Sequence, residues 1–169
     1  VFADDNFTVV PVRREGEKLK PLEEEINSKG GKCFSFSLDA RKEDEVKNFI
    51  ERVELEIGEI EIAIYNIGAN IKYNLTETSS KKYFKVWEMA TFGAFLMGRE
   101  VAKNMIKRKR GTIIFTGATA SIRGGDGFSA FAGAKNAKRA LAQSMARELG
   151  PKGIHVAHII IDGAIDTPW

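Results

Sequence analysis

The sequence predicts an α/β protein with a doubly wound parallel sheet. Two observations support this fold class. Short, nearly continuous apolar segments alternate along the chain with longer amphipathic segments, a pattern typical of parallel sheets covered by helices on both faces. In addition, no repeat, linker or low-complexity segment interrupts the alternation. The chain has 169 residues, and we expect a single domain over 1–169.

The first part of the chain is expected to hold two strands and two helices. Phe7–Val12 is apolar enough for a strand, although Pro11 cannot donate a hydrogen bond to a neighbouring strand. Gly16–Lys29 is expected to form a helix, and Cys33–Leu38 a second strand. In Glu43–Ile57 the apolar residues fall on one stripe, as in a helix that packs against a sheet.

The second part repeats this alternation with longer helices. Ile60–Tyr65 is the expected third strand. From about Ser80 to Arg108 an apolar residue recurs every three or four positions, which predicts one long helix. A further helix should end at Gly150-Pro151, a strong stop signal. This helix is expected over Ser129–Leu149, and the remaining two strands are expected over Ile113–Thr116 and Ile154–Ile161.

Composition excludes several classes of partner. The 26 basic and 23 acidic residues give a net charge of +3, which is too balanced to indicate nucleic acid. The basic run Lys107–Arg110 falls at a predicted helix end, where the helix dipole favours cations. No apolar run approaches the roughly 20 residues that span a bilayer, and no signal peptide opens the chain. With one cysteine, Cys33, no internal disulfide can form. We expect no membrane partner and a cytoplasmic location.

No metal site is expected. His155 and His158 lie on one predicted strand at an odd spacing, so they face opposite sides and cannot form a simple zinc pair. The residues that matter for a ligand should instead follow the strands, because parallel sheets bind ligands beyond their carboxyl ends. These are Arg13-Arg14, Asp39, Asn66–Asn70, Gly117–Ser121 and Asp162–Thr167.

Four segments, in the right order on the right elements, resemble motifs of the short-chain dehydrogenase/reductase family. Tyr65-Asn-Ile-Gly-Ala69 is similar to the family's Asn-Asn-Ala-Gly motif. Gly111–Ser121 corresponds to the strand that carries the catalytic serine, and Phe131-Ala-Gly-Ala-Lys135 to Tyr-x-x-x-Lys. Asp162–Pro168 resembles the segment that closes over nicotinamide. The resemblance implies a Rossmann-like domain and an oxidoreductase that acts on a carbonyl or alcohol substrate.

The resemblance also implies which residues contact a cofactor. Arg13 and Arg14 occupy the turn that meets the adenosine ribose. Arginine there suits the extra phosphate of NADP, whereas a carboxylate would suit NAD, so we expect NADP rather than NAD. Asp39 either meets the adenine amino group, as in the family, or forms an Asx turn before the next helix. The other implied contacts are Asn66, Gly68, Lys135, Ile165 and Thr167.

Three of the four catalytic positions depart from the family pattern. Phe131 stands where the family has its tyrosine acid, Ala118 where it has serine and Ala90 where it has asparagine, while Lys135 is kept. Phe131 and Lys135 are four residues apart and share a helix face. Nearby hydroxyls, including Ser121 and Ser129, are not well placed to replace the tyrosine. The chain is therefore either an oxidoreductase with an atypical active site or a non-catalytic nucleotide-binding or scaffold protein.

The family's first strand and its glycine-rich loop are not found in this chain, and its end at Trp169 precedes the family's usual last helix and strand. The first strand normally joins the two halves of the sheet. Without it, we expect two unpaired strand edges inside the domain, a costly arrangement, and we expect the chain to be part of a longer product. The resemblance also implies a homodimer or homotetramer, formed through the two long helices.

Overall fold

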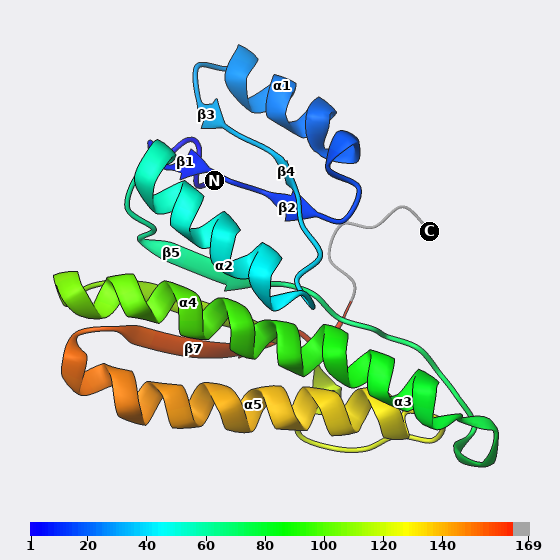
Figure 1. Cartoon of the computed structure of the whole chain (residues 1–169). Coiled ribbons are helices and arrows are strands. Elements are labelled where there is room, and N and C mark those ends of the chain that lie inside the picture. Colours follow the sequence, from blue (N-terminus) through cyan, green and yellow to red (C-terminus); the bar gives the residue numbers. More distant parts are fainter. Residues whose placement is uncertain (164–169) are drawn as a thin grey trace.

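The structure of the chain, a computed structural model, describes residues 1–163 (Figure 1). It has the predicted α/β architecture of parallel strands and covering helices. The strands form three separate sheets within the described residues: two two-stranded pairs near the N-terminus and one three-stranded sheet. Among residues 1–163 we find no helix long and apolar enough to cross a membrane.

The N-terminal strands are short and interrupted. β1 (Thr8–Val9) pairs in parallel with β3 (Lys32–Cys33), and β2 (Val12–Arg13) with β4 (Phe36–Ser37). Pro11 lies at the break between β1 and β2. Its carbonyl accepts a hydrogen bond from Phe36 N at 3.1 Å, but it has no N–H to donate to the opposite strand. The expected strand is therefore divided at its proline.

The helices of this part follow the predicted boundaries closely. A 3₁₀ turn (Gly16–Leu19) leads into α1 (Lys20–Ser28), which packs against β3. α2 (Glu43–Arg52) continues into a π-helical turn (Val53–Ile57), so helical backbone spans the whole expected segment. The π turn was not predicted.

The second part contains the three-stranded sheet and the long helices. β5 (Ile62–Tyr65), β6 (Thr112–Gly117) and β7 (His155–Ile160) lie in that order, all parallel. The predicted long helix is α3 (Ser80–Trp87), a π turn (Glu88–Phe92) and α4 (Gly93–Arg108) in direct succession. The last helix is α5 (Ser129–Leu149). Short 3₁₀ turns lie at Leu75–Glu77, Thr119–Ser121 and Gly150–Lys152.

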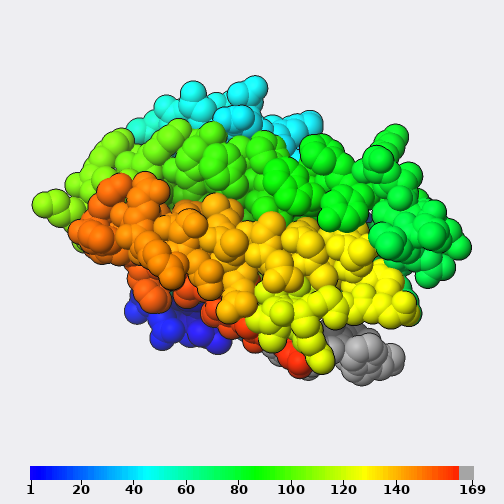
Figure 2. All heavy atoms as spheres, turned by 90° about the horizontal axis from the view of Figure 1, so that it is seen from below, coloured from blue at the N-terminus to red at the C-terminus, as the bar shows by residue number. Residues whose placement is uncertain are grey.

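Helices α4 and α5 cover one face of the three-stranded sheet, and Figure 2 shows them side by side in the view from below. The residues beneath them, such as Ile113 and Phe115, are completely buried. On the opposite face of the same strands, Ile64 and Ile159 remain 45% and 47% exposed. The main core therefore lies between this sheet and the α2–α4–α5 layer.

A cavity of about 680 Å³ separates the N-terminal strands from β5. One wall is the chain from Phe7 to Val12 and the other is the chain from Gly58 to Ile67, with apolar side chains of α2 at the back. β5 pairs only with β6, and β1 and β2 only with β3 and β4. Among the described residues, the strand edges on the two sides of this cavity are thus unpaired, as expected from the sequence.

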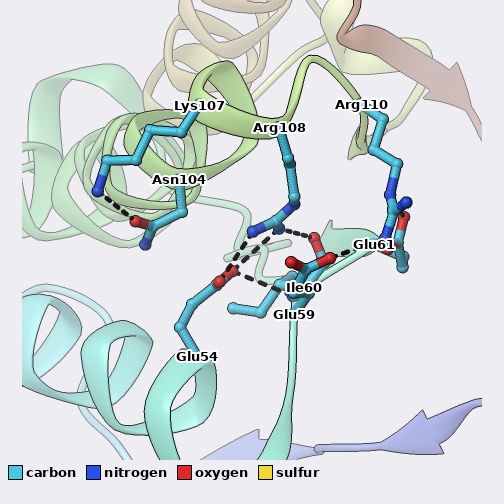
Figure 3. A network of polar contacts seen from close by, with 8 residues as sticks. All are labelled: Glu54, Glu59, Ile60, Glu61, Asn104, Lys107, Arg108 and Arg110. Atoms are coloured by element: carbon cyan, nitrogen blue, oxygen red, sulfur yellow. Dashed lines mark hydrogen bonds and ion pairs between the residues drawn. The ribbon is translucent and has the colours of Figure 1, made fainter.

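The basic run at the end of α4 is neutralised by acidic residues around β5 (Figure 3). Arg108 contacts both carboxylate oxygens of Glu54, at 2.8 and 3.0 Å, and donates to Ile60 O. Arg110 pairs with Glu59 and Glu61. Two of the four charges in this run therefore already have carboxylate partners. Besides the helix dipole, this pairing is a second reason for basic residues at this position, without a nucleic-acid partner.

Candidate functional site

Lys135 occupies the position that the Tyr-x-x-x-Lys resemblance implies. It lies on α5, is only 5% exposed, and donates a hydrogen bond from Nζ to Thr116 O at 3.1 Å. Gly68 lies beside it: a Cβ atom there would be 3.4 Å from Lys135 Nζ. The lysine ammonium thus sits at the carboxyl ends of β5 and β6, the edge where a parallel sheet binds ligands.

The three replaced catalytic positions come together as one apolar cluster. Phe131 is 6% exposed and Ala90 is completely buried, and Ala118 packs against the same cluster. The Lys135 ammonium lies 5.4 Å from the centre of the Phe131 ring. Nearby, Thr91 Oγ1 donates to Ala134 O at 2.7 Å and ties the π turn to α5. The three positions that the resemblance implies are therefore close together and apolar in this structure.

Two of the neighbouring hydroxyls already have partners. Ser121 is fully buried, and its Oγ accepts from Ala118 N at 3.1 Å. Thr119 Oγ1 donates to Asp162. Ser129, at the start of α5, is exposed. That no hydroxyl takes the place of the tyrosine remains a prediction.

Lys138 is a functional candidate that the sequence reasoning missed. It lies one turn after Lys135, is completely buried, and donates to Ile67 O at 3.4 Å. Its ammonium is also 5.4 Å from the Tyr65 ring. Burial, then the nearby charge of Lys135, lowers the pKa of Lys138 to about 7. The available signal was spacing: positions 131, 135 and 138 repeat at intervals of four and three, which places them on one helix face.

Arg13 and Arg14 follow the end of β2, where the resemblance implies the adenosine ribose. Both are exposed, and within residues 1–163 neither has a carboxylate partner within 4 Å. Glu15, the next residue, pairs with Lys18 instead. Gly16 then lets the turn pack closely, since a Cβ atom there would lie 2.5 Å from Ser37 Oγ. Two guanidinium groups are thus available at this turn.

Asp39 forms the Asx turn that was one of the two roles expected for it. Its carboxylate accepts from Arg41 Nε at 2.8 Å, Arg41 Nη2 at 2.5 Å and the Arg41 backbone N at 3.1 Å. The Arg41 side chain, as the largest cause, lowers the pKa of Asp39 to about 2. The adenine contact remains a prediction, and it would have to share this carboxylate.

The other implied contacts are placed in part. Asn66 and Gly68 are both exposed at the end of β5, near Lys135. The structure brings together Gly68 and Lys135, while Asn66 follows the end of β5 and Arg13 and Arg14 lie at the end of β2. Ile165 and Thr167 lie outside the described residues.

Parallel strands, helices in the order predicted and a buried lysine at the carboxyl edge define a Rossmann-like α/β protein. The chain belongs to the short-chain dehydrogenase family, since the model of that family, described as short chain dehydrogenase, matches residues 1–169. It is therefore an oxidoreductase-family chain.

Individual relatives agree with this assignment. The chain is 30% identical over 140 residues to the 2-dehydro-3-deoxy-D-gluconate 5-dehydrogenase of Formosa agariphila, covering 83% of this chain and 53% of that protein. A crystal structure of a short-chain dehydrogenase from Rhodopseudomonas palustris is 52% identical, with a TM-score of 0.92, and the match covers 99% and 76% of the two chains. A gluconate 5-dehydrogenase from Burkholderia cenocepacia, solved with NADP and tartrate, shares the fold at 22% identity, a TM-score of 0.89 and coverages of 95% and 63%.

The chain spans about half the length of several of the curated relatives it matches: 53% of the Formosa enzyme, 58% of a bovine 3-oxoacyl-[acyl-carrier-protein] reductase and 57% of a Pseudoalteromonas dehydrogenase. The activity, substrates and partners of the whole protein are therefore matters of proposal.

Proposed function

We propose that this chain is part of an oxidoreductase that uses NADP(H) to interconvert a carbonyl and an alcohol at an atypical active site. The observation that supports the cofactor most directly is the pair of exposed arginines without carboxylate partners at the end of β2. Guanidinium groups match the geometry and charge of a phosphate. The relatives described above, which include dehydrogenases and one structure with bound NADP, are consistent with this choice.

The residues of the site fit a nicotinamide dinucleotide at both ends. Arg13 and Arg14 would bind the extra phosphate, and Lys135, held next to Gly68, would hold the nicotinamide ribose. The cofactor would supply or accept a hydride. The chain's own residues position it: the apolar cluster around Phe131 and Ala90 would exclude water from the reacting carbonyl, and a buried ammonium stabilises negative charge on oxygen more strongly than one in water.

A fluorescence titration of the protein with NADPH and then NADH tests the cofactor. We expect tighter binding of NADPH. Replacing both arginines, as R13Q/R14Q, should weaken NADPH binding by roughly 10- to 100-fold, the value of one or two charge-assisted contacts, and leave NADH binding unchanged. R147Q, which removes one charge from the exposed surface of α5, is the matched control.

The outcomes separate the two readings of the chain. No binding of either nucleotide would refute the proposal. Preferred NADPH binding without turnover on a panel of aldehydes and ketones would favour the non-catalytic alternative, which otherwise rests only on Phe131, Ala118 and Ala90. If F131Y restores measurable reduction, the tyrosine alone limits the chemistry.

We also propose a homodimer or homotetramer assembled through the long helices. A ladder of stacked rings runs along α3, the π turn and α4, with centroid separations of 5.8 to 6.3 Å between successive rings. Its outer members are exposed: Phe84 by 56% and Phe95 by 37%. Sedimentation of the protein over a range of concentrations would test this assembly. The cytoplasmic location expected from the sequence remains a prediction.

A further inference from the structure

Two lysine side chains are buried side by side without an acidic partner. Lys138 is completely buried and Lys135 is 5% exposed. Within residues 1–163 neither has a carboxylate within ion-pair distance; the Nζ atoms donate only to the backbone oxygens of Thr116 and Ile67. A buried charge without a partner is costly, so two full charges here would be strongly disfavoured.

The two amines also approach the same stretch of chain after β5: Lys138 Nζ donates to Ile67 O, and a Cβ atom at the next residue, Gly68, would lie 3.4 Å from Lys135 Nζ. Two ammonium groups held close together without a carboxylate repel each other, which favours one neutral amine. Burial lowers the pKa of both lysines. For Lys135 the neighbouring Lys138 partly offsets the lowering of the pKa, whereas for Lys138 the charge of Lys135 adds to it. Lys138 is therefore the amine that loses its proton first.

The groups around the pair do not supply a negative charge. From β5, the Tyr65 ring faces Lys138, and its hydroxyl donates to Met89 O at 2.6 Å. From β7, His158 has a buried Nε2 without a hydrogen-bond partner, and burial followed by the charges of Lys138, Arg139 and Lys135 lowers its pKa. Among residues 1–163, the further charges that act on these groups belong to Arg139 on α5, a cation, and to Asp39, which acts on Tyr65 and is itself paired with Arg41. The surroundings thus favour a single proton on the pair.

This pair lies directly beside the position that lacks its acid. Phe131, Lys135 and Lys138 share one face of α5, and the Lys135 ammonium is 5.4 Å from the Phe131 ring. Lysine normally keeps its proton too tightly to act as an acid at neutral pH, with a pKa near 10.4. A pair that shares one proton in a desolvated site can release it more readily.

We propose that Lys135 and Lys138 form a proton-sharing pair in which Lys135 is the catalytic acid and Lys138 a positioning residue that tunes it. This inference rests on the proposed function. When the carbon of a substrate carbonyl accepts a hydride from a reduced nicotinamide, the carbonyl π electrons move to oxygen. That oxygen takes the proton from Lys135 Nζ, the N–H bond breaks, and the amine left behind is reprotonated from water. In alcohol oxidation each transfer is reversed.

The pairing is tested without turnover by following the lysine ε-CH₂ signals by NMR across a pH titration. In the wild type we expect one lysine to titrate near pH 7. In K135M, the Lys138 signal should titrate at higher pH, because a neighbouring charge is gone. In K138M, the Lys135 signal should titrate at lower pH, because the neighbouring amine that raises the pKa of Lys135 is gone. K47M, on the exposed side of α2, should move neither signal.

Unchanged titration of each lysine in the other's variant would overturn the proposal. Methionine is apolar and similar in length, so both variants should fold; circular dichroism checks this, and the wild-type signal near pH 7 is a test that needs no variant.

The catalytic step is tested by the rate of carbonyl reduction with NADPH. K135M should lose at least about 100-fold in rate, the lower range for a general acid. In K138M the fall in rate at high pH should begin at lower pH, a change that a purely structural role would not produce. A pH profile of K138M that matches the wild type would refute the tuning role. If the lysine titrations are coupled but neither nucleotide binds, the proposed function is refuted and the lysine pair is supported. If a nucleotide binds but the lysine titrations are not coupled, only the lysine pair is refuted.

Discussion

The N-terminal part of the molecule, up to α2, and the part from β5 onward use the same strand–helix pattern but achieve different packing. In the second part, six-residue strands β6 and β7 lie in one continuous ladder beneath α4 and α5. In the first, four strands of two residues each form two pairs broken at Pro11. Within residues 1–163 a cavity lies between β5 and the N-terminal strands, and no strand pairing joins the two parts.

In the described residues, contacts between helices, rather than strand pairing, hold the two parts together. α2 packs against α4, Arg99 pairs with Glu43, and Arg108 reaches the turn after α2. A parallel sheet normally transmits cooperativity by ladder hydrogen bonds across its strands. Within residues 1–163 the contacts between the two parts run mainly through α2, so we expect the first part of this chain to be the less stable of the two.

Substitution of one phenylalanine in each part should show the largest difference. Phe115 is completely buried under α4 and α5, and F115A should lower the free energy of unfolding by about 3–5 kcal/mol. Phe36 in β4 is only half-buried, against the Phe49 ring at 5.6 Å, so F36A should cost about 1–2 kcal/mol. Urea unfolding measures both. Equal losses would contradict the view that the two parts differ in packing.

Breaking the link at Arg108 should have the next largest effect. R108M removes a bidentate contact to Glu54 and a bond to Ile60 O, leaving a largely buried carboxylate unpaired, at a cost of about 2–3 kcal/mol. K107M, which loses only an exposed contact to Asn104, is the neighbouring control. An unchanged thermal unfolding temperature in R108M would show that the Arg108–Glu54 contact does not stabilise the chain.

Asp39 should make the stability of the first part depend on pH. The pKa of its carboxyl is lowered to about 2 in the folded chain and is about 3.9 when unfolded. The folded state binds its proton less readily, so the stabilisation is complete above about pH 5 and disappears as the pH falls toward about 2. Its size is about 2–3 kcal/mol, because a tenfold change in proton affinity corresponds to about 1.4 kcal/mol. D39N should lose that amount at pH 7 and show a flatter unfolding profile between pH 5 and pH 2.

Much of this fold could be predicted because local signals agree with the tertiary structure. α5 has the predicted bounds, since Gly150-Pro151 ends it, and the periodicity from Ser80 to Arg108 extends through all of α3 and α4. The π turns were missed because one extra residue per turn hardly disturbs a pattern of apolar positions. Most strands were predicted too long, whereas β6 was predicted one residue too short at each end. Ladder pairing depends on a neighbouring strand that the segment itself does not specify.

The site was predictable in outline for the same reason. The motifs placed Lys135, Phe131, Ala90 and Asn66 in one region. Lys138 was missed because a lysine is usually exposed, and only its neighbours reveal its burial. The engagement of Asp39 with Arg41 depends on a side-chain orientation that residue spacing does not determine.

The reactivity of Cys33 reports whether the N-terminal strands of the less stable part are paired. Its thiol lies 1% exposed in β3, and burial, then the charge of Glu23, raises its pKa. The reactive form of cysteine is the thiolate, so this sulfur is both shielded and protonated while β3 stays paired with β1. Because the chain has no other cysteine, its resistance to oxidation becomes a direct measure of how long the first strands remain in place.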